Sequence, residues 1–456
     1  MEKRILVYGA GRSGIGAADL CAALGADTYL YDQNTELDAA ELAGKLSRPE
    51  RVKVLLGSIP EEVLGAIDCA VLSPGVSPEK PGVLALKERG IPVTGEVELA
   101  FSAEKGRVLA ITGTNGKTTT TALLGRIMED SGAETFVVGN IGRAYAAEVL
   151  KTNADSVTVA EISSFQLETI ESFRPAVSAI LNITPDHLDR HHTMEEYIRV
   201  KELITKNQTK EDVCVLNFED PILREFGENK CSARVVWFSS RRELPEGLFL
   251  RGTKIIVKCE GSERTLLDTG ELLLLGCHNH ENVMAAAAMA LAAGVPLERV
   301  AETCRVFPPV EHRIEFVEEK GGVAWYNDSK GTNPDAAIKG IEAMTRPTLL
   351  IAGGFNKHSD YRAWIRTFGG RVKYLVLEGE TRFAIRDAAL DCGFPEERIV
   401  LFKTMPEACE FCRGHSAPGD AVLLSPACAS WGEFPNYEVR GKIFKDYVRE
   451  KVGEEA

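Results

Sequence analysis

Ile111-Thr-Gly-Thr-Asn-Gly-Lys-Thr-Thr-Thr120 connects two runs of different character. An apolar run from Arg107 to Thr112 leads into it, and a helix-compatible run from Thr121 to Met128 leads out of it. A strand, a glycine loop and a helix in this order hold phosphate groups, because glycines let backbone N–H groups close on the oxygens and the helix N-terminus adds a favourable dipole. We therefore expect Lys117 to reach the β- and γ-phosphates of a nucleotide and the Thr118 hydroxyl to bind Mg²⁺.

The loop departs from the complete phosphate-binding pattern at one position, because Ile111 and not glycine stands five residues before Gly116. A plain glycine-rich turn is the alternative interpretation. The strand before the loop and the helix after it favour phosphate binding. The expected ATP-binding residues of the loop are Gly113, Thr114, Asn115, Gly116, Lys117, Thr118 and Thr119.

Length and composition indicate an ordinary soluble protein. The chain has 456 residues, enough for about two to four domains with large cores. Apolar residues make up 44% and charged residues 26%. The net charge of −14 argues against a nucleic-acid surface, whereas a pocket for ATP needs just a few well-placed donors.

The eleven cysteines are scattered along the chain, and their odd number argues against a disulfide framework. Cys409 and Cys412 form a C-x-x-C pair in a stretch that also fits one turn of a helix. Since no second pair accompanies it, we expect buried thiols there and no zinc or redox site.

The N-terminus and the most apolar run give no sign of a signal peptide or a membrane span. The N-terminus runs from a short apolar stretch straight into a glycine turn, without the apolar core and cleavage site of a signal peptide. The most apolar run, from Val283 to Val295, is shorter than the about 20 residues that span a bilayer. We expect a cytoplasmic protein without a membrane partner.

Residues 1–104 are expected to alternate between strands and helices, which favours a parallel sheet. Gly9-Ala-Gly-Arg-Ser-Gly14 follows the first expected strand and Asp32 closes the second, as in a dinucleotide-binding fingerprint. A nicotinamide dehydrogenase would also need a catalytic constellation, and none is evident. The expected strands are Ile5–Tyr8, Thr28–Tyr31, Val52–Leu56, Cys69–Leu72 and Ile91–Val93.

The remaining chain is expected to form two further domains. Phe307-Pro-Pro309 is the best boundary between them, because proline interrupts a helix and stiffens a linker. Residues from 309 onward alternate again, as in a doubly wound domain. The expected strands of the two domains are Val157–Ala160, Val177–Leu181, Thr348–Ile351, Tyr374–Leu377, Ile399–Phe402 and Ala421–Leu424.

Further segments, taken with the glycine loop, make the chain similar to one family. They are Ala160–Glu168, Asn182–Asp189, His278–Asn282 and Glu311–Arg313. In this order they resemble segments of the Mur ligase family, which also includes folylpolyglutamate synthetases. The resemblance covers essentially the whole chain. It implies an α/β fold with three domains: a Rossmann-like UDP-substrate domain (1–104), a central P-loop-type ATPase domain (105–308) and a C-terminal doubly wound, Rossmann-like amino-acid domain (309–456).

Within the family, Asn327–Asn333 and Leu424–Ser430 resemble the members that add D-glutamate to UDP-N-acetylmuramoyl-L-alanine. The resemblance implies an ATP-dependent amide-forming ligase of peptidoglycan precursor synthesis, acting as a monomer on those two small molecules. A carboxylate is a poor acyl donor, and ATP overcomes this by forming an acyl phosphate, with ADP and phosphate as products. Such a site needs phosphate cradling, Mg²⁺ and donors at the transferring phosphoryl group.

By this resemblance the first domain holds the UDP part of the substrate and not NAD. Ser73-Pro-Gly75 ends the fourth expected strand and resembles the family's second diphosphate-proximal turn. Asn140 resembles a family asparagine near the substrate and the phosphates. The expected residues for this substrate are Gly11, Arg12, Ser13, Asp32, Ser73, Gly75 and Asn140.

Three residues of the middle segment are expected beside the phosphates. Glu161 ends a buried strand, where an acid is costly unless it is paired or binds metal, so Glu161 and Thr118 are expected Mg²⁺ ligands. By resemblance His187 lies near a second Mg²⁺. Lys201 stands where the family has a lysine carbamylated by CO₂, which would supply an anion to Mg²⁺. A surface helix lysine is the alternative.

The segment around His187 also looks like a metal cluster, because further acids and histidines flank it. We carry only His187 forward and expect its neighbours to be solvated. Those neighbours are Asp186, Asp189, His191 and His192.

The last expected residues serve ATP and the amino acid. Asn282 would meet the adenine end of ATP, with Asn279 one turn away as a second candidate or a helix cap. Arg313 would reach the ATP phosphates across a domain interface. The resemblance assigns Asp328 to the ribose and Lys330 to the acyl-transfer centre. The D-glutamate pocket is expected from Thr332, Lys357, Ser430 and Tyr437.

The sequence departs from the family pattern at Phe355, where relatives often have Asp, and at Trp431, where they often have Leu. Four functions are weighed: the D-glutamate ligase, a related ligase for another amino acid or a folate chain, a nucleotide-binding regulatory module without turnover, and a nicotinamide dehydrogenase, which only the first-domain glycines favour. Lys117, Glu161, His187 and Lys201 together argue against the regulatory module.

Overall fold

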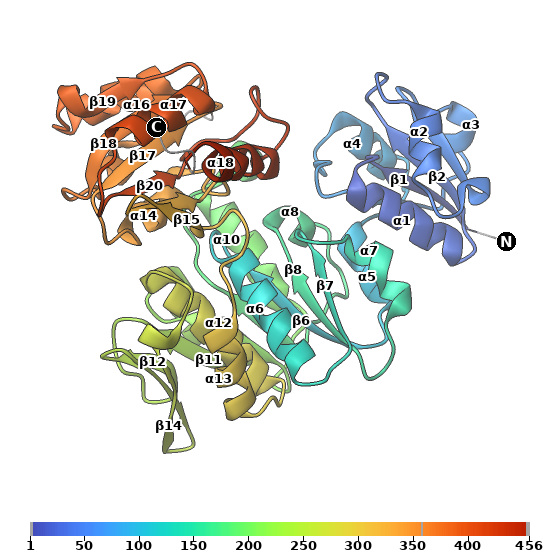
Figure 1. The fold of residues 1–456 in the computed structure, drawn as a ribbon. Helices are drawn as coiled ribbons and strands as arrows, with labels where there is room; N and C mark the ends of the chain where they lie inside the picture. Colours follow the sequence, from blue (N-terminus) through green and yellow to red (C-terminus); the bar gives the residue numbers. More distant parts are fainter. Residues whose placement is uncertain (1–2, 357–358, 453–456) are drawn as a thin grey trace. The chain divides into compact units, whose positions relative to one another are not determined.

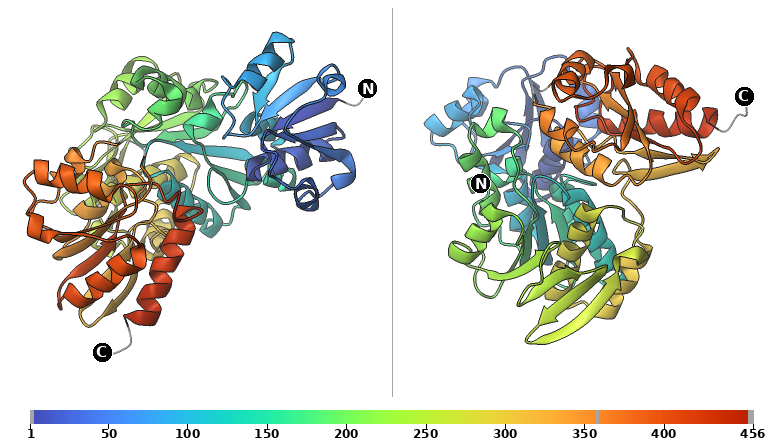
Figure 2. Two further views of the ribbon diagram at one scale, coloured as in Figure 1. Left: turned by 90° about the horizontal axis from the view of Figure 1, so that it is seen from above. Right: turned by 90° about the vertical axis from the view of Figure 1, so that its left-hand side faces the viewer.

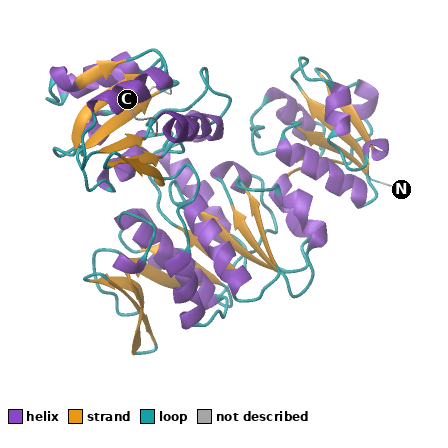
Figure 3. Cartoon of the chain, viewed as in Figure 1, coloured by secondary structure: helices purple, strands orange, loops and turns teal. Residues whose placement is uncertain are grey.

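A computed structural model describes residues 3–356 and 359–452 (Figure 1). Three β-sheets with covering helices organise them, as the secondary-structure colouring makes clear (Figure 3). The chain divides into two compact units, the first formed by Met1–Glu271 with Glu281–Val306 and the second by Leu272–His280 with Phe307–Ala456. The first unit contains two of the sheets, and the second unit contains the third.

The first sheet has five parallel strands in the order β3-β2-β1-β4-β5. Its strands are β1 (Arg4–Tyr8), β2 (Asp27–Asp32), β3 (Val52–Leu56), β4 (Cys69–Leu72) and β5 (Val93–Gly95). Its helices are α1 (Arg12–Ala23), α2 (Ala39–Gly44), α3 (Glu61–Leu64), α4 (Pro81–Glu88) and α5 (Glu96–Ala103). In this Rossmann-like order the direction of winding reverses between β1 and β4, and ligands bind at the carboxyl ends of the strands at such a reversal.

The turn after β1 requires glycine at two positions. Gly9 has a φ of +101°, and a Cβ on Gly14 would stand 1.7 Å from the carbonyl oxygen of Gly9. The N–H of Ala10 donates to Oδ2 of Asp32 at 2.8 Å, so the acid at the end of β2 holds the turn. The glycine spacing therefore identified a real strand-to-helix turn, and the acid has a structural partner within it.

The central sheet has nine strands in the order β14-β13-β12-β11-β10-β9-β6-β8-β7. The seven strands from β12 to β7 are parallel. These strands are β6 (Arg107–Thr112), β7 (Thr135–Gly139), β8 (Val157–Glu161), β9 (Val177–Ile180), β10 (Val213–Asn217), β11 (Arg234–Ser239) and β12 (Gly247–Arg251). Helices α6 (Lys117–Asp130), α7 (Tyr145–Glu148), α8 (Ser164–Leu167), α9 (Leu188–His191), α10 (Met194–Glu202), α11 (Pro221–Asn229), α12 (Cys277–Ala292) and α13 (Leu297–Val306) accompany them.

An antiparallel extension at one edge of the central sheet was not among the sequence expectations. β12 pairs with β13 (Lys254–Cys259), which pairs with β14 (Ser262–Asp268), both antiparallel (Figure 2). The first four residues of β14 are exposed and polar. A strand at an open edge buries little apolar surface, so its sequence lacks the apolar run that marks a central strand.

The third sheet has six strands in the order β15-β16-β20-β17-β18-β19, and only the edge strand β15 is antiparallel among these described strands. The strands are β15 (Glu315–Lys320), β16 (Val323–Asn327), β17 (Thr348–Gly353), β18 (Val372–Glu378), β19 (Ile399–Leu401) and β20 (Ala421–Leu424). The helices are α14 (Pro334–Glu342), α15 (Arg362–Ile365), α16 (Arg382–Asp391), α17 (Met405–His415) and α18 (Tyr437–Lys451). The predicted doubly wound sheet is therefore present, with one antiparallel strand added.

Each expected strand is present, and the bounds of one of them need correction. β5 begins at Val93, so Ile91 and Pro92 precede the strand. Proline has no N–H to donate to a neighbouring strand, and Pro92 takes part through its carbonyl oxygen, which accepts from the N–H of Ala70.

The C-x-x-C pair lies on α17, and both thiols are buried in the core of the third sheet. Burial raises the pKa of Cys409 and of Cys412. All eleven cysteines are free thiols, and no group of acidic, histidine and cysteine side chains in the described part of the chain has the geometry of a metal site. The prediction of buried thiols is confirmed.

The apolar run from Val283 belongs to α12 and the turn after it, and its residues from Val283 to Ala290 are buried inside the protein. Over the part of the chain that the structure describes, no helix has both the length and the apolar character needed to cross a membrane.

Candidate functional site

The glycine loop lies between β6, a strand buried in the middle of its sheet, and the N-terminus of α6. Gly116 has a φ of +86°, and a Cβ there would stand 2.2 Å from Oδ1 of Asn282. Gly113 has a φ of +146°, and a Cβ there would stand 3.1 Å from Cβ of Leu181. Glycine is thus required at both positions for backbone conformation and for space. A loop of this kind at a helix N-terminus is a phosphate-binding arrangement.

Asn182, just beyond the end of β9, holds the glycine loop in place. Its carbonyl oxygen accepts from the N–H of Thr114 at 2.9 Å. Its Oδ1 accepts from the N–H of Asn115 at 2.8 Å, and its Nδ2 donates to the carbonyl oxygen of Asn115 at 3.0 Å. Since three hydrogen bonds from one residue fix two loop residues, the loop is organised before any ligand binds.

Two lysines meet at the carbonyl oxygen of Gly113. Nζ of Lys117 and Nζ of Lys201 each donate to it at 2.8 Å. The Lys201 side chain is buried, so the alternative of a surface helix lysine is wrong. Burial, together with the neighbouring Lys117 cation, lowers the pKa of Lys201 well below its usual value. Burial therefore favours the uncharged, nucleophilic form of this amine.

Glu161 is buried at the end of β8, next to β6. Its Oε1 accepts from Nδ2 of Asn140 at 2.8 Å. Its Oε2 is buried and has no hydrogen-bond partner within the described residues. A buried carboxylate oxygen without a partner is costly in a protein and suits a hard cation. Oε2 of Glu161 therefore fits a hard cation such as Mg²⁺. Thr118, the second expected ligand, stands in the first turn of α6.

His187 precedes α9 with a left-handed backbone, φ 52° and ψ 32°. Its ring packs edge-on against Phe165, with centroids 4.9 Å apart, and its side chain remains 42% exposed. Its Nε2 lies 3.6 Å from Oδ2 of Asp186. The role expected for His187 near a second Mg²⁺ stays a prediction.

The expectation that the neighbours of His187 are all solvated is wrong for His191. His191 is buried, and its Nε2 lies 2.9 Å from Oγ of Ser164. Burial lowers the pKa of His191 to about 4, so its ring is neutral at pH 7. Asp189 and His192 are exposed as expected. A ring on the inner face of the short helix α9 is not distinguishable from an outer one by sequence spacing.

All seven residues expected to hold the UDP substrate line one cavity of about 410 Å³ in the first unit. A volume of this size is typical of small-molecule sites. Oγ of Ser73, on the cavity wall, donates to the carbonyl oxygen of Gly9 at 2.8 Å, which ties the turn after β4 to the turn after β1. The seven residues are Gly11, Arg12, Ser13, Asp32, Ser73, Gly75 and Asn140.

Asp328, in the second unit, is completely buried. Its Oδ2 accepts from Oγ of Ser425 at 2.7 Å, and its Oδ1 lies 3.8 Å from Nη1 of Arg313. Burial raises the pKa of Asp328 to about 6, while the Arg313 cation opposes this effect. The structure thus brings Asp328 and Arg313 together, and Asp328 is engaged with protein groups.

Lys330 and Tyr437 also lie together in the second unit, because Nζ of Lys330 stands 5.3 Å from the centre of the Tyr437 ring. Thr332 is half-buried, and Ser430 is buried. Lys357, expected to bind the D-glutamate side chain, lies outside the described residues.

The two departures from the family pattern contact each other. The rings of Phe355 and Trp431 pack edge-on with centroids 5.9 Å apart, and both side chains are exposed. The N–H of Phe355 donates to the carbonyl oxygen of Ala429 at 2.9 Å. The loop after β17 is therefore joined by a backbone bond to the segment that carries Ser430.

Arg440 was missed by sequence reasoning. It is fully buried in α18, and its Nε and Nη2 donate to Oγ and to the carbonyl oxygen of Ser329 at 3.0 and 2.8 Å. Nη2 also donates to the carbonyl oxygen of Cys428 at 3.2 Å. One guanidinium thus joins the segment of Asp328 and Lys330 to the segment of Ser430. A helix arginine carries no sequence signal that tells a buried position from an exposed one.

Asn282 and Asn279 lie on α12 as expected, and both are buried. Oδ1 of Asn282 accepts from Oγ1 of Thr120 at 3.4 Å, next to the glycine loop. Nδ2 of Asn279 donates to the carbonyl oxygen of Leu275 at 2.7 Å, which ties the first turn of α12 to the segment before it.

Comparison with known proteins agrees with this geometry. Three family models match successive parts of the chain: the Mur ligase MurD-like N-terminal domain over residues 3–95, the Mur ligase middle domain over residues 111–290 and the Mur ligase glutamate ligase domain over residues 312–428. The UDP-N-acetylmuramoylalanine--D-glutamate ligase of Lachnoclostridium phytofermentans is 53% identical over 98% of this chain and 98% of that protein. The enzyme of the same name from Lachnospira eligens is 52% identical, also over 98% of each chain.

Among solved structures, UDP-N-acetylmuramate-alanine ligase MurC from Thermotoga maritima aligns with a TM-score of 0.61 over 98% of this chain and 99% of that chain. At 16% identity this likeness concerns the fold. The three successive models, the full-length relatives and the shared architecture of three α/β domains show that the chain belongs to the Mur ligase family.

Proposed function

We propose that this protein is an ATP-dependent ligase that adds D-glutamate to UDP-N-acetylmuramoyl-L-alanine in peptidoglycan precursor synthesis. One observation carries the proposal: Asn140 lines the cavity of the seven expected substrate residues and also donates to Glu161, which lies next to the strand of the phosphate loop. A substrate in that cavity would have its acyl end near the phosphates. The names of the full-length relatives support the same reaction.

In the proposed reaction a carboxylate oxygen of the UDP substrate attacks the γ-phosphorus of ATP, which gives an acyl phosphate and ADP. The amine of D-glutamate then attacks the acyl carbon, and phosphate leaves with that oxygen. Lys117 would turn from the loop carbonyl oxygens to the β- and γ-phosphates, and backbone N–H groups of the loop would bind the same oxygens. Mg²⁺ bound by Glu161 and Thr118 would neutralise charge at the phosphates.

We also propose that Lys201 is carbamylated and supplies an anion to a second Mg²⁺ near His187. The uncharged Nζ would add to the carbon of CO₂ and release one proton, which leaves a carbamate. Burial of the side chain and the lowered pKa support this proposal, since the neutral amine is the reactive form. A buried cation beside the Lys117 cation is otherwise costly.

The D-glutamate pocket is proposed from Thr332, Lys357, Ser430 and Tyr437, and Arg313 and Lys330 are proposed to act at the phosphates and the acyl-transfer centre. The proximity of Lys330 to the Tyr437 ring supports this grouping. Asp328 is proposed to meet the ATP ribose and Asn282 the adenine. We further propose a monomer in the cytoplasm, with residues 1–104, 105–308 and 309–456 as its three domains.

Phosphate release tests the function. The protein is incubated with ATP, Mg²⁺ and UDP-N-acetylmuramoyl-L-alanine, and D- and L-amino acids are added one at a time. Release should depend on D-glutamate and exceed release with D-glutamine at least tenfold, since a charge-assisted bond to a carboxylate contributes roughly 1.5–3 kcal/mol. Preference for another amino acid would support a related ligase instead. ATP binding without amino-acid-dependent release would support a regulatory module.

The lysine assigned to the side-chain carboxylate has its own test. Lys357→Ala should raise the KM for D-glutamate strongly and the KM for ATP little, because the charge lost faces one substrate. Equal use of D-glutamate and D-glutamine by the unmodified protein would end the specificity assignment while the ligase assignment survived.

A further inference from the structure

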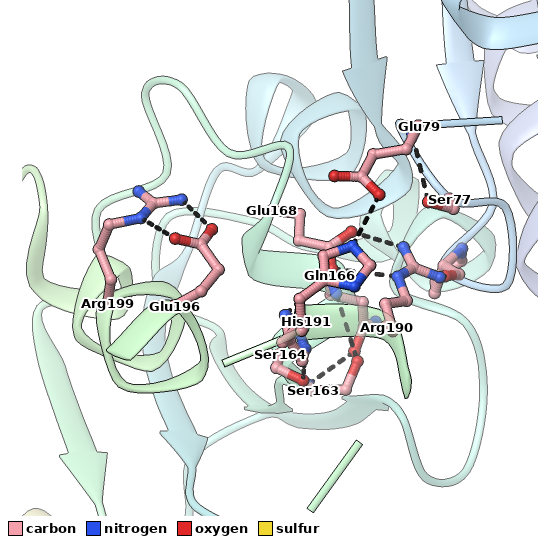
Figure 4. Close-up of polar contacts among 12 residues, drawn as sticks. Ser77, Glu79, Ser163, Ser164, Gln166, Glu168, Arg190, His191, Glu196 and Arg199 are labelled. Atoms are coloured by element: carbon pink, nitrogen blue, oxygen red, sulfur yellow. Dashed lines mark hydrogen bonds and ion pairs between the residues drawn. The ribbon is translucent and has the colours of Figure 1, made fainter. Parts of the chain in front are cut away.

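A largely buried ion pair joins Arg190 of α9 to Glu168, the residue after α8 (Figure 4). Their side chains are 12% and 13% exposed. Nε of Arg190 donates to Oε1 of Glu168 at 3.1 Å, and Nη2 donates to Oε2. The guanidinium also lies over the Phe165 ring, 4.2 Å from its centroid. Two parallel bonds fix the orientation of both groups as well as their distance.

The same guanidinium reaches the turn that follows β4 in the first sheet. Nη1 donates to the carbonyl oxygen of Pro74 at 3.1 Å, and Nη2 donates to that of Val76 at 3.4 Å. Pro74 and Val76 line the substrate cavity together with Ser73 and Gly75. Arg190 therefore connects the wall of the cavity to the short helix that begins directly after His187.

His191 carries the contacts onward to α8. Its Nε2 lies 2.9 Å from Oγ of Ser164, and its Nδ1 lies 3.6 Å from Oε1 of Glu168 (Figure 4). Ser164 begins α8, three residues after Glu161. Gln166 of the same helix lines the cavity. The contacts thus run from the cavity turn through Arg190 and His191 to the helix that follows the proposed metal ligand.

Stability alone is a weak explanation for this pair. Taking two charges out of water offsets much of their attraction, and an apolar pair of similar size is often as stable. The two other hydrogen bonds of the guanidinium go to carbonyl oxygens of the cavity turn, which fix its direction as well as attract it. These bonds fix the position of α9 against the turn after β4.

We propose that Arg190 is a positioning residue, which holds the cavity turn at Pro74 and Val76 in register with His187, so that the acyl end of the UDP substrate meets the phosphate loop. The proposal rests on the ligase function proposed above. A displacement of about 1 Å at a reacting centre can cost on the order of a hundredfold in rate. Loss of this alignment should therefore lower kcat and weaken binding of the UDP substrate, while binding of ATP changes little.

The test compares Arg190→Lys with Arg199→Lys. Lysine keeps the charge at position 190 and cannot make the four bonds of the guanidinium. Arg199 is a matched control, because it also donates two hydrogen bonds to one carboxylate, that of Glu196, at 2.8 and 2.6 Å (Figure 4). Both residues lie on α10, and the Arg199 side chain is 58% exposed. Arg190→Lys should lower kcat at least tenfold, raise the KM for the UDP substrate at least threefold and leave the KM for ATP within twofold. Arg199→Lys should leave all three within twofold.

Glu168→Gln is the second variant and decides the matter if Arg190→Lys does not fold. It keeps the acceptor oxygen and removes the charge that orients Arg190, so the same pattern of kcat and KM is expected, reduced in size. Melting temperatures and direct binding of UDP-N-acetylmuramoyl-L-alanine are measured alongside, with binding weakened at least threefold in both variants.

Either of two results, in each variant that folds, would overturn the inference. The first is a kcat and every KM within twofold of the unmodified protein. The second is activity reduced in proportion to the folded fraction with every KM unchanged. Failure of the ligase function itself would look different, because the unmodified protein would then release no phosphate in response to D-glutamate.

Discussion

Lys117 donates to two carbonyl oxygens of its own loop and stands at the first position of α6. We expect Lys117→Ala to lower the ligation rate at least about a hundredfold, since loss of one donor of this kind costs roughly 3 kcal/mol. Phosphate release gives the rate, and calorimetry shows whether the variant is folded. Lys151→Ala, which removes an exposed lysine paired with Glu148, should behave like the unmodified protein. A folded Lys117→Ala protein with a near-normal rate would refute the assignment.

Lys201 offers a chemical test of carbamylation. Lys201→Ala should be nearly inactive, and acetate or formate should restore part of the rate, because a small carboxylate can replace the missing anion at Mg²⁺. Lys206→Ala, at an exposed lysine shortly after α10, should keep its rate and not respond to the acids. Full activity of Lys201→Ala without acid, or an unmodified Lys201 in the active protein at adequate CO₂, would exclude the proposal.

Single residues differ in how far sequence predicts them. Gly113, Gly116 and Lys117 were predicted because backbone shape and phosphate chemistry restrict the residue types at those positions. The burial of His191 and the contacts of Arg190 were not predicted. Both depend on partners far away in the chain, and local spacing does not report distant partners.

At the scale of elements, Gly116 decides how the phosphate loop enters α6. We expect Gly116→Ala to lose stability and ATP affinity, because the new Cβ would stand 2.2 Å from Oδ1 of Asn282 at a φ of +86°. Gly132, just beyond the other end of α6, has a similar φ of +91° with nothing within 4 Å of the position of a Cβ. Gly132→Ala therefore isolates the backbone cost of about 1 kcal/mol. Chemical denaturation and ATP titration compare the two, and equal losses in both would contradict the proposed role of the contact.

The contact between Glu96 of α5 and Ala146 of α7 leads us to expect that the stability of the protein depends on pH. Glu96 is buried, its Oε1 accepts from the N–H of Ala146, and burial raises its pKa to about 7 from 4.5. The folded protein then holds a proton that the unfolded chain releases between these values. This contribution to stability is complete below pH 4.5 and is lost as the pH rises through 7, by up to about 3 kcal/mol.

Glu96→Gln should flatten that decline when unfolding free energies are measured at pH 5 and pH 8. Glu62→Gln, at an exposed position of α3, should leave the decline as it is. A decline of equal size in Glu96→Gln would show that the proton lies elsewhere.

Elements were predicted where burial leaves a mark in the sequence. Strands β6, β8 and β20 are buried, and their apolar runs gave nearly the observed bounds. β14 and β15 were not predicted, because edge strands are partly exposed and carry mixed polar sequences. The parallel core followed from the sequence in the first sheet and only in part in the other two. Strands β7, β10, β11, β12 and β16 were not among the expected strands, although β10 is buried throughout.

At the scale of the whole molecule, the proposed reaction is distinguished from its alternatives by which product receives one carboxylate oxygen of the UDP substrate. If ligation proceeds through an acyl phosphate, a carboxylate oxygen of the UDP substrate becomes the bridge to phosphorus, and it leaves with phosphate when the amine attacks. An adenylate route would instead leave that oxygen on AMP. A regulatory module without turnover would transfer no oxygen.

The most direct test uses UDP-N-acetylmuramoyl-L-alanine with ¹⁸O in its terminal carboxylate, together with ATP, Mg²⁺ and D-glutamate. Phosphate and nucleotide products are analysed by mass spectrometry. The account predicts one ¹⁸O atom in each phosphate released, unlabelled ADP and one amide bond for each phosphate. Unlabelled phosphate, or label in AMP, would contradict it.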